Sequence, residues 1–160
     1  MKKLLILLVF SFTYGHAQYL VEDNDISENT KELGKISVFY ELNNPLEFYR
    51  LKCDNAVYAQ FPGGENAFKR TLYQNMQSVV NSGVYSVNGT FELQISINKS
   101  GKLESFQLKP EVPNSNLLYH DLEMALKKIT TKWTPGSCSG VPVDSKLRLK
   151  VNFRTDSFDI

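Results

Sequence analysis

Two segments of this 160-residue chain alternate apolar and polar residues without a break, and they limit the possible folds more than any other feature. One covers residues 90–98 and the other residues 146–154. Strict alternation puts the apolar side chains on one face of an extended strand and leaves the other face in water. The pattern therefore predicts an antiparallel sheet with one covered face. The apolar positions are Phe91, Leu93, Ile95, Ile97, Leu147, Leu149, Val151 and Phe153.

A hairpin is expected directly after the first of these strands. Lys99, Ser100 and Gly101 supply a tight turn, and Gly101 stands where a positive φ is most often needed. Residues 102–109 form the return strand. Within it Leu103 is out of phase with Phe106 and Leu108, which predicts a bulge near Glu104 or Ser105.

Two amphipathic helices are predicted beside these strands. The first runs from about residue 65 to about residue 78, after the turn at Pro62, Gly63 and Gly64, and the second covers residues 115–130. Ser115 or Asn114 is expected to cap the second helix, and Glu123 and Lys127 to form an i,i+4 ion pair. The order helix, strand, strand, helix, strand predicts an α+β domain with both helices on the apolar face of the sheet. The helical stripes are Ala67, Phe68, Leu72 and Met76, and Leu118, Leu122, Ala125, Leu126 and Ile129.

Residues 1–17 have the organisation of a secretory signal peptide. Lys2 and Lys3 precede an apolar run that is too short for a transmembrane helix of about 20 residues. Small residues, Gly15 and Ala17, stand before a cut ahead of Gln18. We expect an exported protein in the periplasm or outside the cell. An uncleaved leader that stays as an inner-membrane anchor is the alternative.

The segment between the leader and the helices, residues 18–58, has weaker patterns. Residues 18–34 are polar and acid-rich, and we interpret them as a flexible extension. Residues 36–41 alternate, a turn follows at Asn43, Asn44 and Pro45, and residues 46–51 are apolar and aromatic. We expect two short strands joined by a turn there, and a short hairpin formed by the two is one interpretation.

Charge and composition limit the chemistry. The formal charge is +1 and becomes −1 if residues 1–17 are removed, since they carry Lys2 and Lys3 and no acid. A balance this even is unlike the basic excess of a dedicated nucleic-acid binder. Two Cys and two His offer few metal ligands, and His120 beside Asp121 and Glu123 is better read as a solvated helix face than as an acid–base site. We expect no enzyme, no metal, no cofactor and no small-molecule substrate.

The two cysteines, Cys53 and Cys138, allow one pairing. In an oxidising compartment a disulfide between them can persist, and it would stabilise the fold by roughly 4 kcal/mol on the chain-entropy model. Two separate buried thiols are the alternative.

A glycine-rich phosphate site at residues 62–64 is a weaker interpretation of the turn before the first helix, because the Lys-Ser/Thr ending of a nucleotide loop is missing.

Short motifs spread over residues 59–154 resemble the C-terminal domain of TonB in the form common in Bacteroidetes. They follow one another at matching intervals, and the resemblance implies a three-stranded antiparallel sheet with two helices on one side. The Tyr-Pro pair that many members carry after the first helix is absent, because residues 77–80 read QSVV. The motifs are AQFPGG at 59–64, Asn88-Gly89, KSGKL at 99–103, WTPG at 133–136 and GVPV at 140–143. We therefore expect a TonB C-terminal-like domain over residues 59–156.

The resemblance also implies a function. Domains of this family bind an extended receptor segment by adding it to the sheet at the last strand, which is β-augmentation. Here that edge would be residues 146–154, and its partner-binding residues Lys146, Arg148, Lys150, Asn152 and Arg154. Charged residues that protect an edge against pairing are the alternative interpretation. A homodimer through the same edge also stays open.

Because the leader looks cleavable and no Pro-rich spacer follows it, the chain departs from the family's energy transducer. The expected protein is therefore an exported interaction module in the periplasm, with a protein or extended peptide as its partner and a link to outer-membrane transport through a receptor. The alternative is a membrane-anchored component of TonB-type energy transduction that keeps its leader.

Overall fold

The computed structural model describes residues 35–80, 84–111 and 115–158. The expected leader, residues 1–17, and the acid-rich residues 18–34 lie outside these ranges. No helix in the described ranges is long and apolar enough to cross a membrane. Residues 36–157 form one compact unit.

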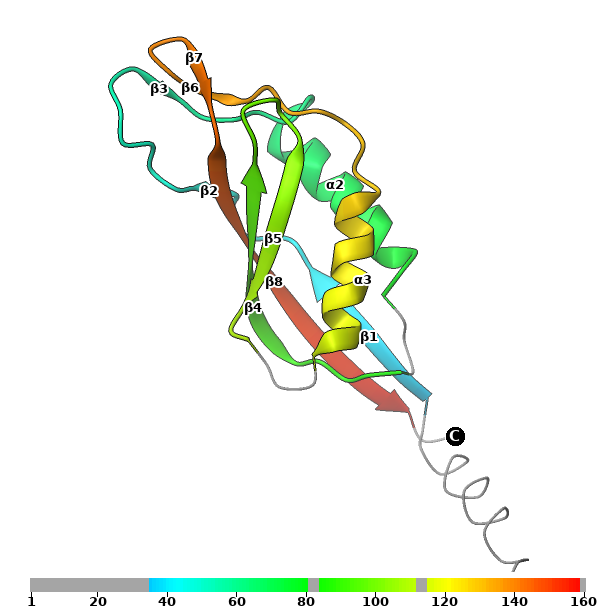
Figure 1. Ribbon diagram of the computed structural model, residues 1–160. Helices are drawn as coiled ribbons and strands as arrows, with labels where there is room; N and C mark the ends of the chain where they lie inside the picture. Colours follow the sequence, from blue (N-terminus) through cyan, green and yellow to red (C-terminus); the bar gives the residue numbers. More distant parts are fainter. Residues whose placement is uncertain (1–34, 81–83, 112–114, 159–160) are drawn as a thin grey trace, which may run out of the picture. The chain divides into compact units, whose positions relative to one another are not determined.

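The largest element is a five-stranded sheet with the order β1-β8-β4-β5, in which β2 also pairs with β8 (Figure 1). The pairs β4–β5, β4–β8 and β2–β8 are antiparallel. A smaller antiparallel sheet has the order β3-β6-β7. The strands of the large sheet are β1 (Lys35–Glu41), β2 (Glu47–Phe48), β4 (Gly89–Ile97), β5 (Leu103–Lys109) and β8 (Ser145–Phe158), and those of the small one are β3 (Ala56–Val57), β6 (Gly136–Cys138) and β7 (Val141–Val143).

The register confirms what the alternating patterns predict. Phe91 lies opposite Val151, Leu93 opposite Leu149 and Ile95 opposite Leu147, so the apolar residues of β4 and β8 share one face. All of them are almost fully buried. In the β4–β5 hairpin Ser96 pairs with Ser105 and Ile97 with Leu103, which leaves Glu104 as the extra residue of a bulge. Gly101 has a φ of +79° at the turn, as expected.

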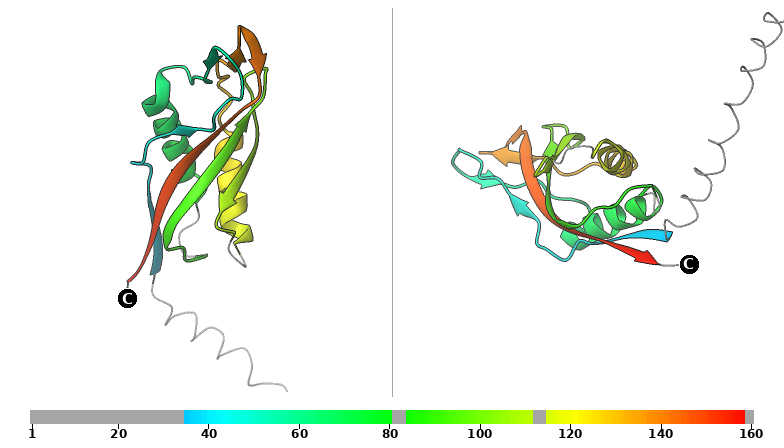
Figure 2. Two further views of the ribbon diagram at one scale, coloured as in Figure 1. Left: turned by 90° about the vertical axis from the view of Figure 1, so that its left-hand side faces the viewer. Right: turned by 90° about the horizontal axis from the view of Figure 1, so that it is seen from below.

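Both helices, α2 (Gly64–Gln77) and α3 (Asn116–Lys127), pack against that apolar face. In Figure 2, α2 lies on the side of β1 and β8, and α3 on the side of β4 and β5. The two stripes predicted for the helices supply their buried residues, and the Glu123–Lys127 ion pair is present at 2.9 Å. Ser115 occupies the N-cap position of α3, but its side chain makes no capping hydrogen bond.

The chain is α+β with two helices on one sheet face, but the sheet differs from the expected three strands. The two extra strands come from residues 35–48, and these do not form a hairpin with each other. Both lie along β8 instead, where Glu47 is opposite Arg148 and Phe48 opposite Leu147. The physical reason is that β4 pairs with only one edge of β8, so the backbone groups on its other edge are left for further strands to satisfy; Arg148, for example, lies opposite Gln94 on one side and Glu47 on the other.

The disulfide joins Cys53 to Cys138, as the cysteine pairing predicts. It connects the segment before β3 to β6, and β3 and β6 are also paired through Ala56 and Cys138. Gln60 and Thr134 continue this contact with two backbone hydrogen bonds of 2.9 and 2.8 Å. The chain entering α2 is therefore tied to the chain leaving α3.

Candidate binding surface

The five residues expected to bind a partner lie together on β8, on the face that the helices leave open. They alternate along the strand with Leu147, Leu149, Val151 and Phe153, which are buried under the helices. The five are Lys146, Arg148, Lys150, Asn152 and Arg154. The structure therefore brings them to one face, as the alternation predicts.

Their expected position at a sheet edge is wrong. Strand β8 has β4 on one side, and β1 and β2 on the other. Its outer backbone groups are used by the same chain: the amide of Tyr49 donates to the carbonyl of Lys146 at 2.9 Å, and the Asn44 side chain donates to the carbonyl of Lys150 at 3.2 Å. A foreign strand can reach this edge only after residues 36–49 leave it.

Arg148 is the most heavily engaged of the five. Its Nε donates to Glu47 Oε2 at 2.8 Å, its Nη1 lies 3.6 Å from Glu92 Oε2, and its guanidinium sits 5.7 Å from the ring centre of Tyr49. Glu92 also accepts hydrogen bonds from Gln94 and from the Tyr49 hydroxyl. Because two carboxylates already neutralise Arg148, it belongs to an internal network of the sheet face.

The other four residues differ in whether their side chains already make contacts within the chain. The Asn152 side chain accepts a hydrogen bond from Thr90 at 2.8 Å. Arg154 pairs with Asp156 at 3.1 Å and lies over the ring of Phe39 at 5.4 Å. Lys146 and Lys150 are exposed, and within the described part of the chain neither forms an ion pair. Only these two lysines are open cations on β8.

The network around Glu92 makes a testable prediction about pH. The hydrogen bond from Gln94, helped by Tyr49 and Arg148, lowers the pKa of Glu92. A carboxyl whose pKa is lower in the folded state stabilises the fold above its unfolded pKa, near pH 4 to 5, and loses this contribution as the pH falls. Urea unfolding should show a fall in the free energy of unfolding from pH 7 to pH 3, and Glu92→Gln should make the fall shallower. An equal fall in the free energy of unfolding in the two proteins would contradict this prediction. The variant should still lose some stability as the pH falls, because the hydrogen bond from Lys69 lowers the pKa of Glu65 in the same way.

The remaining strand edges differ in how open they are. Strand β5 is interrupted by the bulge at Glu104, and the Tyr119 hydroxyl donates to the carbonyl of Phe106 at 3.2 Å. Strand β7 contains Pro142, which has no N–H to offer, and β3 is two residues long. Bulges, prolines and short length are devices that blunt an edge.

Strand β1 carries none of these devices. It is a seven-residue strand of the sequence KISVFYE at the end of the strand order, and no described strand lies beyond it. Aromatic and β-branched residues of this kind are those that strands favour. Phe39 projects onto the open face and is 45% exposed. The sequence pattern identifies this segment as a strand, but only the topology shows that it is the edge.

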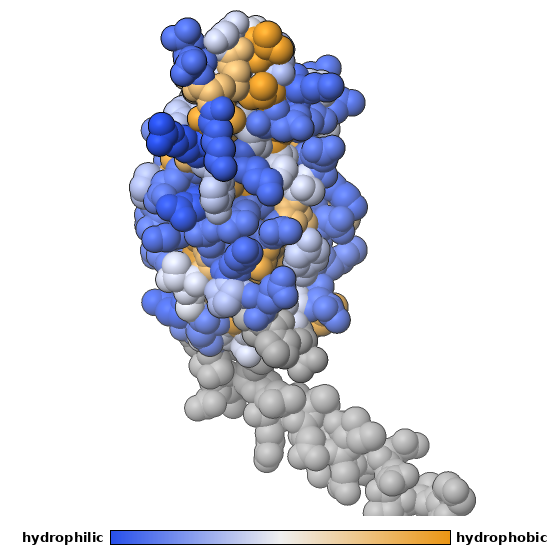
Figure 3. Space-filling model, turned by 60° about the vertical axis from the view of Figure 1, so that its left-hand side comes forward, coloured by the Kyte–Doolittle hydropathy of each residue, from blue (hydrophilic) through white to orange (hydrophobic). Residues whose placement is uncertain are grey.

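Figure 3 shows a mostly hydrophilic surface, with hydrophobic side chains gathered at the end that carries the small sheet. Val57 and Val141, on β3 and β7, are the exposed residues there. They lie at the blunted edges of strands that are two and three residues long. This tip is therefore a weaker candidate for binding an extended segment than β1.

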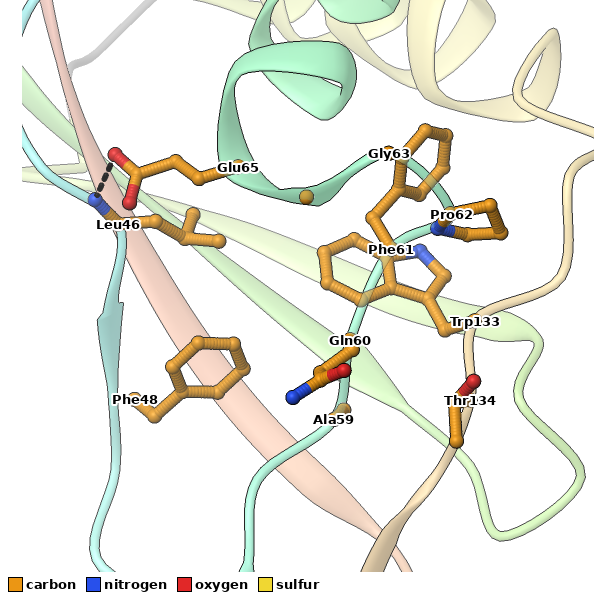
Figure 4. Close-up of a pocket in the computed structure, with 11 residues that line it drawn as sticks. Leu46, Phe48, Ala59, Gln60, Phe61, Pro62, Gly63, Glu65, Trp133 and Thr134 are labelled. Atoms are coloured by element: carbon orange, nitrogen blue, oxygen red, sulfur yellow. Dashed lines mark hydrogen bonds between the residues drawn. The ribbon is translucent and has the colours of Figure 1, made fainter.

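A hollow of about 530 Å³ lies between β2, the start of α2 and Trp133 (Figure 4). Leu46, Phe48 and Trp133 line it, and Glu65 accepts a hydrogen bond from the Leu46 amide at 2.9 Å and pairs with Lys69 at 2.6 Å. A carboxylate at the start of α2 disfavours a phosphate there, which argues against the phosphate interpretation of residues 62–64. Trp133 packs edge-to-face on Phe61 and Phe68 and anchors the core.

No group of His, Cys, Asp and Glu within the described residues is arranged to hold a metal ion. His120 is exposed on α3, and the neighbouring Asp121 accepts a hydrogen bond from the Tyr85 hydroxyl at 2.7 Å. Asp121 is thus committed to a contact between α3 and the segment that leads into β4.

Comparison with known proteins finds no match: no family model, no curated protein and no solved structure is similar to this chain.

Proposed function

We propose that this chain is an exported protein-interaction module that binds an extended segment of a protein partner as an added strand on β1. The observation that carries the proposal is that β1 is a regular seven-residue strand at the end of the strand order, with no described strand beyond it. In β-augmentation the main-chain hydrogen bonds supply affinity, and alternate side chains supply specificity. The proposal assigns the protein no catalytic step.

Two further observations support export and a protein partner. The Cys53–Cys138 disulfide belongs to an oxidising compartment, which agrees with the signal-peptide pattern of residues 1–17. The motif resemblance to the TonB C-terminal domain favours strand addition in the periplasm and a link to an outer-membrane receptor. The proposed edge differs from the one that the resemblance implies, because residues 36–49 already cover β8.

The open face beside β1 gives the partner its first contacts. Phe39 and Arg154 lie against each other on this face, and Lys150 follows along β8. Every second side chain of a strand added to β1 would project onto this face. Exposed aromatic and arginine side chains are those most often found at the energetic centres of interfaces.

A site-specific photo-crosslinker tests this assignment in the native envelope. One variant carries the crosslinker at Phe39 beside β1, and the matched control carries it at Tyr119 beside β5, since both positions hold exposed aromatic residues at opposite edges of one sheet. We expect a defined protein adduct from Phe39 and none from Tyr119. Adducts from Tyr119 alone, or from neither position, would refute strand addition at β1.

A further inference from the structure

A hollow of about 460 Å³ lies between the outer side of α2 and the end of β1, two elements that run side by side in Figure 2. The helix supplies Asn66, Arg70 and Tyr73, which follow one another at i, i+4 and i+7 and therefore share one face of α2. All three side chains are exposed. Seven residues of helix rise about 10 Å, which gives this face the length of a small organic ligand rather than of an ion.

The floor of the hollow is aromatic and is held in place. Tyr73 is 40% exposed, and its ring centre lies 5.1 Å from that of Tyr40, with the two rings tilted at 56°. The Tyr40 hydroxyl donates to the carbonyl of Tyr73 at 3.4 Å, and the ring of Tyr40 also lies 6.2 Å from that of Phe153 on β8. A ring that is already fixed offers a flat apolar surface at little further cost in conformational entropy.

The charges around the hollow cancel. Lys69 and Arg70 are the basic side chains among the described residues that line it, and Glu41 is the acidic one. Lys69 is neutralised by Glu65, which lies outside the hollow, at 2.6 Å. Arg70 and Glu41 then bring one charge of each sign. The hollow therefore lacks the excess of one sign that draws in an ionic ligand.

The rim offers donors and acceptors close together. The guanidinium of Arg70 presents N–H donors in one plane, the carboxylate of Glu41 presents acceptors, and the amide of Asn66 supplies both. The Asn43 amide donates to Glu41 at 3.3 Å and lies on the same rim. A sugar ring matches this combination, because its hydroxyls both donate and accept while its C–H groups form an apolar face. Pockets for small ligands likewise combine aromatic walls with a few polar groups.

We infer that this hollow binds a neutral carbohydrate, whose C–H face packs on the ring of Tyr73 and whose hydroxyls bond to Asn66, Arg70 and Glu41. No reaction is assigned to the site. The signal-peptide pattern of residues 1–17 and the Cys53–Cys138 disulfide both favour a compartment in which the polysaccharides of the cell envelope are within reach. The site is separate from the strand addition proposed at β1, because it uses side chains and none of the backbone groups of that strand.

A glycan array that carries neutral and acidic oligosaccharides, probed with the full chain in its disulfide-bonded form, tests this inference. We expect binding to neutral glycans that persists when salt is added, because no ion pair carries it. Competition by the free oligosaccharide would support a soluble ligand, and co-sedimentation of the chain with insoluble cell-wall polysaccharide would support a polymer. Both sources share the chemistry that the hollow recognises.

Variants of the hollow connect the binding to its floor and its rim. Tyr73→Ala should weaken binding of the selected oligosaccharide by about tenfold in isothermal titration calorimetry, because the stacking surface is lost. Tyr119→Ala is the matched control, since this tyrosine is 41% exposed on the other helix and should bind as the unmodified chain does. Tyr73→Phe keeps the ring and should retain binding, which separates stacking from a loss of fold. Arg70→Met removes rim donors and should also weaken binding.

Three results would overturn the inference. The first is an array on which no glycan is bound. The second is binding of acidic glycans alone that disappears with added salt, because the site would then select charge. The third is equal binding by the Tyr73→Ala and Tyr119→Ala variants. Crosslinking at Phe39 tests strand addition independently of all three, so a failure of the carbohydrate site leaves the proposed function to its own experiment.

Discussion

Replacing Cys53 and Cys138 with serine should lower the free energy of unfolding by about 4 kcal/mol. The disulfide closes a loop that spans a sequence separation of 85 residues, so it removes many conformations from the unfolded chain. Cys138 also lies in β6 opposite Ala56, and the strands at this point have only two and three residues. Without the bridge, the entry to α2 is held by the short β3–β6 ladder, the Gln60–Thr134 hydrogen bonds and the packing of Phe61 on Trp133.

Urea unfolding of the unmodified protein, with its disulfide formed, and of the double serine variant, with and without reductant, measures this effect. The unmodified protein should lose stability only when reduced, and the variant should be insensitive to reductant. If the variant unfolds at the same urea concentration as the oxidised protein, the disulfide has no role in holding the small sheet to the rest of the fold.

Phe68→Ala should cost about 3 to 5 kcal/mol of the free energy of unfolding. Phe68 is fully buried on α2, and its ring centre lies 5.6 Å from that of Phe61 and 4.9 Å from that of Trp133. Trp133 in turn donates its amide to the carbonyl of Gly101 at 2.8 Å. Removing the ring thus opens a cavity where α2, the hairpin turn and the chain after α3 meet.

The fluorescence of Trp133, the single tryptophan of the sequence, follows this unfolding directly. Phe39→Ala is the matched control, because the same ring is deleted from a position that is 45% exposed, and its cost should stay below about 1 kcal/mol. Similar losses in the two variants would mean that the cluster of Phe61, Phe68 and Trp133 is not the centre of the core.

Most of the local structure can be predicted from the sequence, because periodicity reports which face of an element is buried. The alternation in residues 90–98 and 146–154 predicts which residues of β4 and β8 lie under the helices. The phase change at Leu103 predicts the bulge that the register places at Glu104. These features depend on neighbours in the sequence, so a local pattern is sufficient to find them.

The position of β8 in the sheet could not be predicted in the same way. Alternation says which face of a strand is buried and says nothing about which strand lies beside it. The pairing of Glu47 with Arg148 joins residues 101 positions apart, and it satisfies backbone groups on the edge of β8 that β4 leaves unpaired. The resemblance to the TonB C-terminal domain implies that the last strand is an edge, and this is wrong because residues 36–49 cover it.

For the same reason, only part of the candidate site can be predicted from the sequence. The basic row of β8 is predicted by its alternation, yet the network of Arg148 with Glu47 and Glu92 depends on three separate strands. The strand pattern of residues 36–41 was the available signal, and it acquires a binding role only once β1 is known to be an edge beside α2.

Amide hydrogen exchange with and without the partner segment that crosslinks at Phe39 tests the central claim, strand addition at β1, most directly. A strand added to an edge pairs with the amides of that edge and slows their exchange. We predict added protection in residues 36–42 and no change in residues 103–109 of β5. Protection of β5 instead, or faster exchange in residues 36–49 together with new protection in β8, would contradict the account, because the partner segment would then use another edge or displace the chain's own strands.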